Sequence, residues 1–135
     1  MVYTAVFPPN SAPDERIHFA ATYKNSSYVL NTPAKNEDGK VIYYQSDNSL
    51  NNKLGNIPNK AGYQTVFNHL LELRPDDDSQ GFSPYSGVGI HSLLAYIPQT
   101  VGLVAGRLLH LGWIPLITLG RLTGLIFYAV VCRCV

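Results

Sequence analysis

Acidic residues are absent from the last third of this 135-residue chain, and basic residues are scarce there. All nine Asp and Glu residues lie between Asp14 and Asp78, and the Lys and Arg residues after position 90 are Arg107, Arg121 and Arg133. The first ninety residues therefore have a net charge of −2, and the last forty-five have a net charge of +3. Because a soluble domain spreads its charges over its whole surface, this asymmetry predicts two environments.

Other features that are lacking exclude several classes of protein. The overall net charge is +1 without a basic cluster, so we expect no nucleic-acid partner. The chain has two cysteines, Cys132 and Cys134, and we expect no disulfide because both lie where the cytoplasmic face is predicted. The first residues have no basic region and only a short apolar run, so we expect no signal peptide there. We therefore expect a fragment that a membrane segment precedes.

One apolar segment is long enough to cross a bilayer. Residues 114–133 form a nearly continuous apolar run of twenty residues, which is about the length that a transmembrane helix requires. Pro115 suits a first helical turn, Trp113 suits a membrane interface, and Arg133 is a charged stop. The alternative is a buried helix hairpin in a soluble protein. If the segment does cross a membrane, Arg121 is expected to face a polar cavity or a partner, or to extend towards an interface.

The preceding segment, residues 91–110, is predicted to be an amphipathic helix along the membrane surface. Pro98, Gln99 and Arg107 distribute polarity through it, so it contains no uninterrupted apolar run of membrane-spanning length. Its apolar face has residues at spacings of three and four, namely Leu94, Ile97, Val101, Val104 and Leu108.

The first ninety residues are predicted to be an extracytoplasmic loop region of mixed structure. A helix is expected over residues 12–23, with Ser11 as its N-cap, and a short strand over residues 41–44. A second helix is expected over residues 61–73 and a loop over residues 76–85. By the positive-inside tendency, Arg133 places the C-terminal end of the chain in the cytoplasm.

The predicted fold class is therefore a mainly α membrane protein. It consists of a mixed extracytoplasmic loop (1–90), an interfacial helix (91–110) and one transmembrane helix (114–133).

The strongest candidates for chemistry lie at the start of the first predicted helix. Asp14 and Glu15 are adjacent carboxylates, and His18 follows one turn later, so together they can bind a divalent cation or hold a general base. Alternatively, acidic side chains in this position only favour the helix macrodipole. The tyrosines of the outer region can stack on sugar rings, although such residues more often pack a small domain.

Three short motifs occur in a fixed order along the chain. Residues 7–19 read Phe-Pro-Pro-Asn-Ser-Ala-Pro-Asp-Glu-Arg-Ile-His-Phe, and residues 96–103 read Tyr-Ile-Pro-Gln-Thr-Val-Gly-Leu, continuing through Gly-Arg-Leu at 106–108. Residues 119–122 read Leu-Gly-Arg-Leu. In this order they resemble an uncharacterised family of bacterial multi-pass membrane proteins, a domain of unknown function. The first motif resembles its first outer loop, and the third its second membrane helix.

That family is distantly similar to the GT-C glycosyltransferases, which take sugars from polyprenyl-phosphate carriers. The resemblance implies that Asp14 is a catalytic base or an acid near a metal ion, with Glu15 as its catalytic neighbour. It further implies that His18, Arg107 and Arg121 bind substrate. The partners would be the bilayer of the bacterial cell membrane and a polyprenyl-phosphate sugar used in cell-envelope polysaccharide assembly.

The alternative function is a non-catalytic membrane protein whose outer loop binds a cell-wall component or a partner subunit. In either case we expect this fragment alone to be inactive, because two apolar helices do not build the cavity of a GT-C enzyme.

Overall fold

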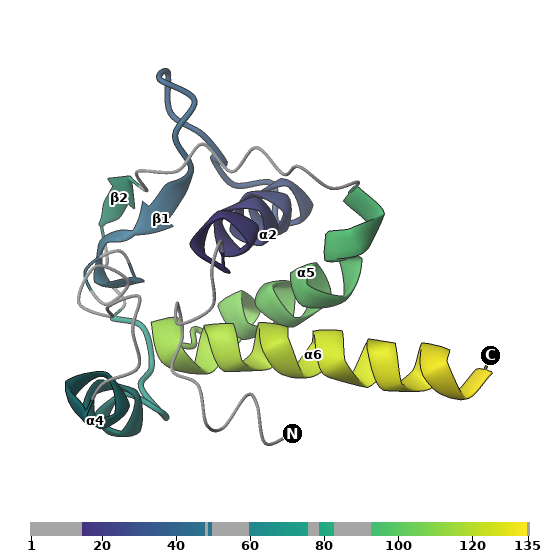
Figure 1. The fold of residues 1–135 in the computed structure, drawn as a ribbon. Helices are drawn as coiled ribbons and strands as arrows, with labels where there is room; N and C mark the ends of the chain where they lie inside the picture. Colours follow the sequence, from purple (N-terminus) through teal and green to yellow (C-terminus); the bar gives the residue numbers. More distant parts are fainter. Residues whose placement is uncertain (1–14, 48, 50–59, 76–78, 83–92, 135) are drawn as a thin grey trace.

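The computed structural model describes residues 15–47, 49, 60–75, 79–82 and 93–134, and its described part is mainly helical (Figure 1). In chain order, the elements are α2 (Glu15–Val29), β1 (Ile42–Tyr44), α4 (Lys60–Asn68), β2 (Gln80–Phe82), α5 (Leu93–Leu108) and α6 (Trp113–Cys134). Helix α2 packs on α5, and α5 packs on α6. The predictions of a mainly helical chain and of one apolar helix long enough to span a membrane are confirmed.

Helix α2 continues six residues beyond Tyr23, where the sequence predicted its end. Serine favours helix ends because its hydroxyl competes for backbone hydrogen bonds. Here the Ser26 hydroxyl donates to the Tyr23 carbonyl within the helix, and both Ser26 and Ser27 accept hydrogen bonds from Arg107. The helix ends where Asn31 adopts a positive φ of 53°, a conformation that asparagine tolerates at a C-terminal cap. Residues 12–14 of the predicted helix lie outside the described residues.

Two short strands form an antiparallel ribbon beside α2. Strand β1 matches the predicted strand, and Tyr43 pairs with Gly81 of β2, in a region predicted to be loop. The Tyr43 ring packs edge-on against Tyr23, with ring centroids 4.6 Å apart. The ribbon therefore fixes the β1 tyrosines over the C-terminal half of α2.

Helix α4 ends at Asn68, five residues before the predicted end at residue 73. The chain leaves the helix because residues 72–74 bond instead to the turn between α5 and α6. The Arg74 N–H donates to the His110 carbonyl over 2.7 Å, and the Gly112 N–H donates to the Glu72 carbonyl over 2.8 Å. These backbone bonds tie the segment after α4 to the start of α6.

Helices α5 and α6 approach each other closely through glycines spaced four residues apart. Gly102 and Gly106 lie on α5, and Gly120 and Gly124 lie on α6. A Cβ on Gly102 would lie 2.9 Å from the Leu119 carbonyl oxygen, so only glycine fits there without a shift of the backbone. Such pairs of small residues are typical of helices that associate in membranes, where close packing replaces the hydrophobic driving force.

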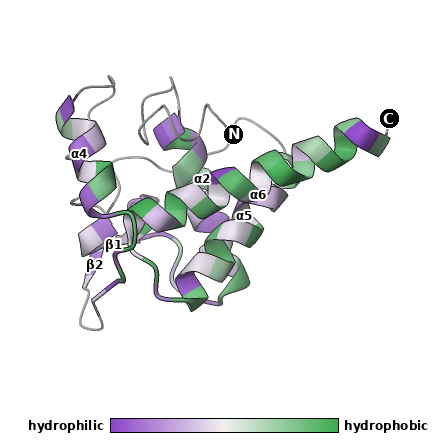
Figure 2. Cartoon of the chain, turned by 90° about the horizontal axis from the view of Figure 1, so that it is seen from below, coloured by the Kyte–Doolittle hydropathy of each residue, from purple (hydrophilic) through white to green (hydrophobic). Residues whose placement is uncertain are grey.

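The outer face of α5 is apolar and exposed. Its residues Leu94, Ile97, Val101 and Leu108 are between 47% and 73% exposed, and they belong to the apolar face predicted from the sequence. The opposite face of α5 packs against α6 through Gly102, Leu103 and Gly106. The described residues thus leave the predicted membrane-facing side of α5 exposed. Figure 2 shows the hydropathy of the residues along this helix.

Helix α6 has two halves with different surroundings. The first half is buried in a core around Trp113, which contacts Phe19 edge-on at a ring separation of 4.6 Å and Tyr43 at 5.5 Å. The second half extends away from the other elements, with apolar side chains exposed along it (Figure 1). These side chains are Leu125, Ile126, Phe127, Tyr128, Val130 and Val131. Among the described helices, α6 is the one long and apolar enough to cross a membrane.

Candidate functional site

Two arginines of α5 and α6 form hydrogen bonds with residues towards the two ends of α2. At the N-terminal end Glu15 binds Arg121 of α6, and near the C-terminal end Ser26 binds Arg107 of α5. Glu15 and Ser26 are eleven residues apart on one helix, which corresponds to about 16 Å. The two arginines were both predicted to bind substrate, and the structure places them in separate clusters towards the two ends of α2.

The first cluster, which we name the acidic end, contains Glu15, His18, Tyr96 and Arg121. The Glu15 Oε1 atom accepts hydrogen bonds from Nε of Arg121, at 2.8 Å, and from Nη2 of the same guanidinium. Both side chains are mostly buried, at 20% and 17% exposure. Arg121 therefore faces a carboxylate partner, which is one of the two environments that the sequence left open.

His18 connects the acidic end to α5. Its Nδ1 atom lies 2.9 Å from the Tyr96 hydroxyl, and the two rings are 5.9 Å apart between centroids. Glu15 and His18 belong to the first sequence motif, Tyr96 to the second and Arg121 to the third. The acidic end therefore brings together residues from all three motifs, although up to 106 positions separate them in the chain. Asp14 lies outside the described residues.

A divalent cation at the acidic end has little support from the described residues. No group of three or more His, Cys, Asp or Glu side chains comes together among them. Moreover, Oε1 of Glu15 is occupied by Arg121, whose positive charge opposes cation binding at the same oxygen. The described side chains thus do not fit a metal site, and no step below depends on one.

The second cluster, which we name the arginine pocket, is centred on Arg107. Nη1 of Arg107 donates to the Ser26 and Ser27 hydroxyls, each over 2.8 Å, and Nη2 donates to the Thr32 hydroxyl over 3.2 Å. The guanidinium also lies over the Tyr23 ring, 4.7 Å from its centroid. Arg107 is 8% exposed, and no carboxylate among the described residues lies within ion-pair distance of it.

A neighbouring arginine shows the contrasting arrangement. Arg74 stacks on Tyr44 at 4.0 Å and donates to the buried Asp47 over 2.7 Å, so a carboxylate neutralises its charge. The Tyr23 hydroxyl also donates to Asp47. Burial first, and then the charge of Asp47, raises the pKa of Tyr23 well above its usual value, so this phenol remains protonated. Arg107 thus keeps a positive charge that hydroxyls and rings solvate but do not neutralise.

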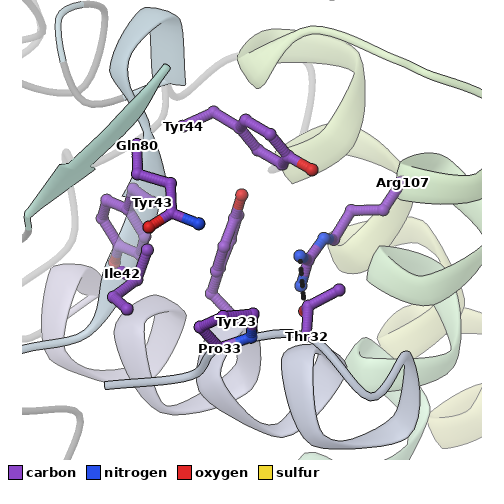
Figure 3. Close-up of a pocket in the computed structure, with 8 residues that line it drawn as sticks. All are labelled: Tyr23, Thr32, Pro33, Ile42, Tyr43, Tyr44, Gln80 and Arg107. Carbon is purple, nitrogen blue, oxygen red and sulfur yellow. Dashed lines mark hydrogen bonds between the residues drawn. The ribbon is translucent and has the colours of Figure 1, made fainter. Parts of the chain in front are cut away.

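A cavity of about 90 Å³ adjoins this guanidinium. It lies between α2, the two strands and α5, and Figure 3 shows the side chains that surround it. They are Tyr23, Thr32, Pro33, Ile42, Tyr43, Tyr44, Gln80 and Arg107. This cavity volume is several times the roughly 10–15 Å³ that a cavity needs to hold one water molecule. The cavity can therefore accept a small polar group between the tyrosines and Arg107.

The sequence singled out Arg107 but not the residues that surround it. Ser26 and Ser27 lie about eighty positions earlier, so no local spacing links them to Arg107. The sequence contains one indication of the packing of α5 on α6. Glycines spaced four residues apart in both helices are typical of helices in close contact.

Comparisons with models of known protein families, with curated protein sequences and with solved structures find no match to this chain.

Proposed function

We propose that this chain forms the outer loop and an adjoining membrane helix of a GT-C-like glycosyltransferase, which uses a lipid-linked sugar in bacterial cell-envelope polysaccharide assembly. The observation that carries the proposal is the convergence of the three motifs at the acidic end. There, Glu15 and His18 of the outer region contact Arg121 and Tyr96 of the apolar helices. These contacts attach the segment that follows Asp14 to the helix proposed to enter the membrane.

In this proposal the bilayer begins near Arg121. The large side chains from Leu125 to Val131 of α6 are apolar and exposed, as a lipid-facing surface requires. Residues 122–134 extend about 20 Å of the roughly 30 Å apolar core. The exposed apolar face of α5 then lies on the membrane surface, with residues 1–90 on the outer side of the membrane. In this proposal Glu15 lies at the membrane surface, where a polyprenyl phosphate presents its head group.

The chemistry assigned to the acidic end is an inverting sugar transfer. Asp14 accepts the proton of the acceptor hydroxyl as that oxygen forms a bond to the anomeric carbon of the sugar. The bond between this carbon and the carrier phosphate breaks, and the phosphate leaves with the bonding electrons. Glu15 is occupied by Arg121, so it acts as a positioning residue that holds the segment carrying Asp14 in place.

Replacing Asp14 with Asn in the protein encoded by the complete reading frame tests the proposal. Asparagine keeps the shape and the capping ability of aspartate but cannot accept the proton. We expect sugar transfer from a polyprenyl-phosphate donor in isolated membranes to fall about 100-fold or more, with unchanged amounts of protein in the membrane. Asp38→Asn, at an exposed turn, is the matched control and should retain activity. Equal activity of the Asp14→Asn and Asp38→Asn proteins would refute the catalytic assignment.

A second function is favoured by the position of the arginine pocket. The pocket lies about 16 Å from the acidic end along α2, so a ligand can bind there without the chemistry of Asp14. This arrangement suits a non-catalytic membrane protein whose outer region recognises a cell-wall component or a partner subunit. Ligand binding that is unaffected by Asp14→Asn, together with no detectable sugar transfer by the unmodified protein, would favour this function.

A further inference from the structure

We infer that the arginine pocket is a binding site for a small oxyanion, which is the carboxylate or phosphate group of a ligand. The inference concerns residues distant from the acidic end and does not depend on sugar transfer. Its basis is the buried charge of Arg107, which the described residues do not neutralise. Burial of a charge without an opposite charge is costly, and a bound anion removes that cost.

The remaining donors of Arg107 match an oxyanion. A guanidinium has five N–H groups, and the hydroxyls of Ser26, Ser27 and Thr32 accept three hydrogen bonds from its two terminal nitrogens. Among the described residues, Nε donates to no acceptor. Carboxylates and phosphates bind arginine through two parallel N–H···O bonds, for which the guanidinium retains two N–H groups.

The lining of the cavity suits the rest of such a ligand. The side-chain amide of Gln80 points into the space opposite Arg107 and can donate to an oxyanion, as Figure 3 shows. Tyr23 is held as a neutral phenol by the raised pKa, so it does not repel an anion. The Asp47 carboxylate accepts hydrogen bonds from Arg74 and Tyr23. The pocket thus presents one free positive charge with polar and aromatic walls.

All the lining residues come from α2, the segment after it, the two strands and α5, and none comes from α6. The pocket is therefore reached from the outer region and not along the exposed apolar half of α6. This placement favours an anion that is dissolved in water. A lipid head group can also present a phosphate or carboxylate group. The experiment below includes both sources.

The test measures binding to the full chain in lipid nanodiscs by isothermal titration calorimetry, at constant ionic strength. The probes are inorganic phosphate, acetate and a short-chain phosphatidic acid, with chloride as the reference anion. We expect saturable binding of at least one probe to the unmodified chain. In Arg107→Gln the Kd should rise by about tenfold or more, and in Arg107→Lys, which keeps the charge but loses the paired donors, by less. Arg133→Gln, the same change at an exposed arginine that does not line the pocket, should leave the Kd unchanged.

A second variant keeps the test valid if Arg107→Gln does not fold. Gln80 is exposed, so Gln80→Glu should fold normally, and its carboxylate supplies the missing negative charge within the pocket. We expect this variant to lose about tenfold or more in affinity, while Gln64→Glu, the same change on the exposed surface of α4, retains it. Binding only of phosphatidic acid would identify a lipid source, and binding of phosphate or acetate a dissolved one. No saturable binding of any probe, or equal affinities in Gln80→Glu and Gln64→Glu, would overturn the inference.

Discussion

The two halves of α6 have similar apolar compositions but opposite surroundings. From Trp113 to Gly120 the helix contributes to the core, with Trp113, Ile114 and Leu116 at most 1% exposed. From Leu125 to Val131, its large apolar side chains are between 37% and 68% exposed among the described residues. Arg121 lies directly after the packed half and binds Glu15 at the start of α2. Hydropathy alone thus does not distinguish a helix segment that is buried in a core from one whose apolar side chains are exposed. The boundary between the two halves is marked by an ion pair.

The arginines within the apolar helices α5 and α6 also differ in their surroundings. Arg121 binds a carboxylate, whereas Arg107 is surrounded by hydroxyls and tyrosine rings. An ion pair between described residues stabilises the contact between two elements, and we infer that the charge without a carboxylate partner among them serves a ligand. The following predictions test the contrast between the two halves of α6, from the largest expected effect to the smallest.

The largest effect is expected from Trp113→Ala in the packed half. Trp113 is 1% exposed and contacts three aromatic rings, so its truncation removes apolar burial and leaves a cavity. We expect the free energy of unfolding, measured by urea titration in detergent micelles, to fall by about 3–5 kcal/mol. Tyr128→Ala in the exposed half is the control, with an expected change below about 0.5 kcal/mol. Equal losses in the two variants would contradict the division of α6 into two halves.

The next effect concerns the close approach of α5 and α6. In Gly102→Val the new side chain meets the backbone of α6, because even a Cβ would lie 2.9 Å from the Leu119 carbonyl oxygen. The two helices must separate, and we expect a loss of about 1–3 kcal/mol in the same titration. Ala105→Val, on the exposed face of α5, introduces the same side chain into open space and should change stability little. A loss of the same size for Ala105→Val would show that valine itself, and not the contact, is responsible.

A smaller effect is expected at the boundary between the halves. Glu15→Gln removes the charge that neutralises Arg121 in a mostly buried pair, so we expect a loss of about 1–2 kcal/mol. A double-mutant cycle with Arg121→Gln measures the coupling between the two side chains. Strictly additive losses would mean that the pair contributes nothing to the attachment of α2 to α6.

The smallest effect is a change in pH dependence at Tyr23, in the core that surrounds the packed half. Because the pKa of Tyr23 is raised above 10.0 in the folded chain, its stabilising contribution is complete below pH 10 and is lost as the pH rises further. Tyr23→Phe should cost about 1 kcal/mol at neutral pH, from the hydrogen bond to Asp47, and should reduce the loss of stability above pH 10. Identical alkaline unfolding curves would argue against a buried, neutral Tyr23.

Local patterns predicted the elements, whereas the contacts between distant segments were not predictable. Apolar spacing indicated α5 and α6 and the exposed face of α5, because periodicity depends on neighbouring positions. The end of α2 was predicted too early because the serines that favour helix ends are held by Arg107, about eighty positions later. Strand β2 was missed because a three-residue strand containing Gly81 has no alternating pattern. The sequence identified Arg107 and Arg121 as candidates. It did not predict that they lie in two different clusters, because their partners are about 80 and 106 positions away in the chain.

The most direct test of the account is the depth of α6 in a bilayer. Single cysteines at Ile126 and Thr118, in a Cys132→Ser and Cys134→Ser background, can be spin-labelled in lipid vesicles and compared for contact with oxygen and with a water-soluble nickel chelate. Both positions are exposed in the structure, so neither label disturbs the core. We predict that the label at position 126 contacts oxygen and is shielded from the chelate, whereas the label at position 118 contacts the chelate. Equal access of the chelate to both labels would show that the exposed half of α6 lies in water, and would contradict the account.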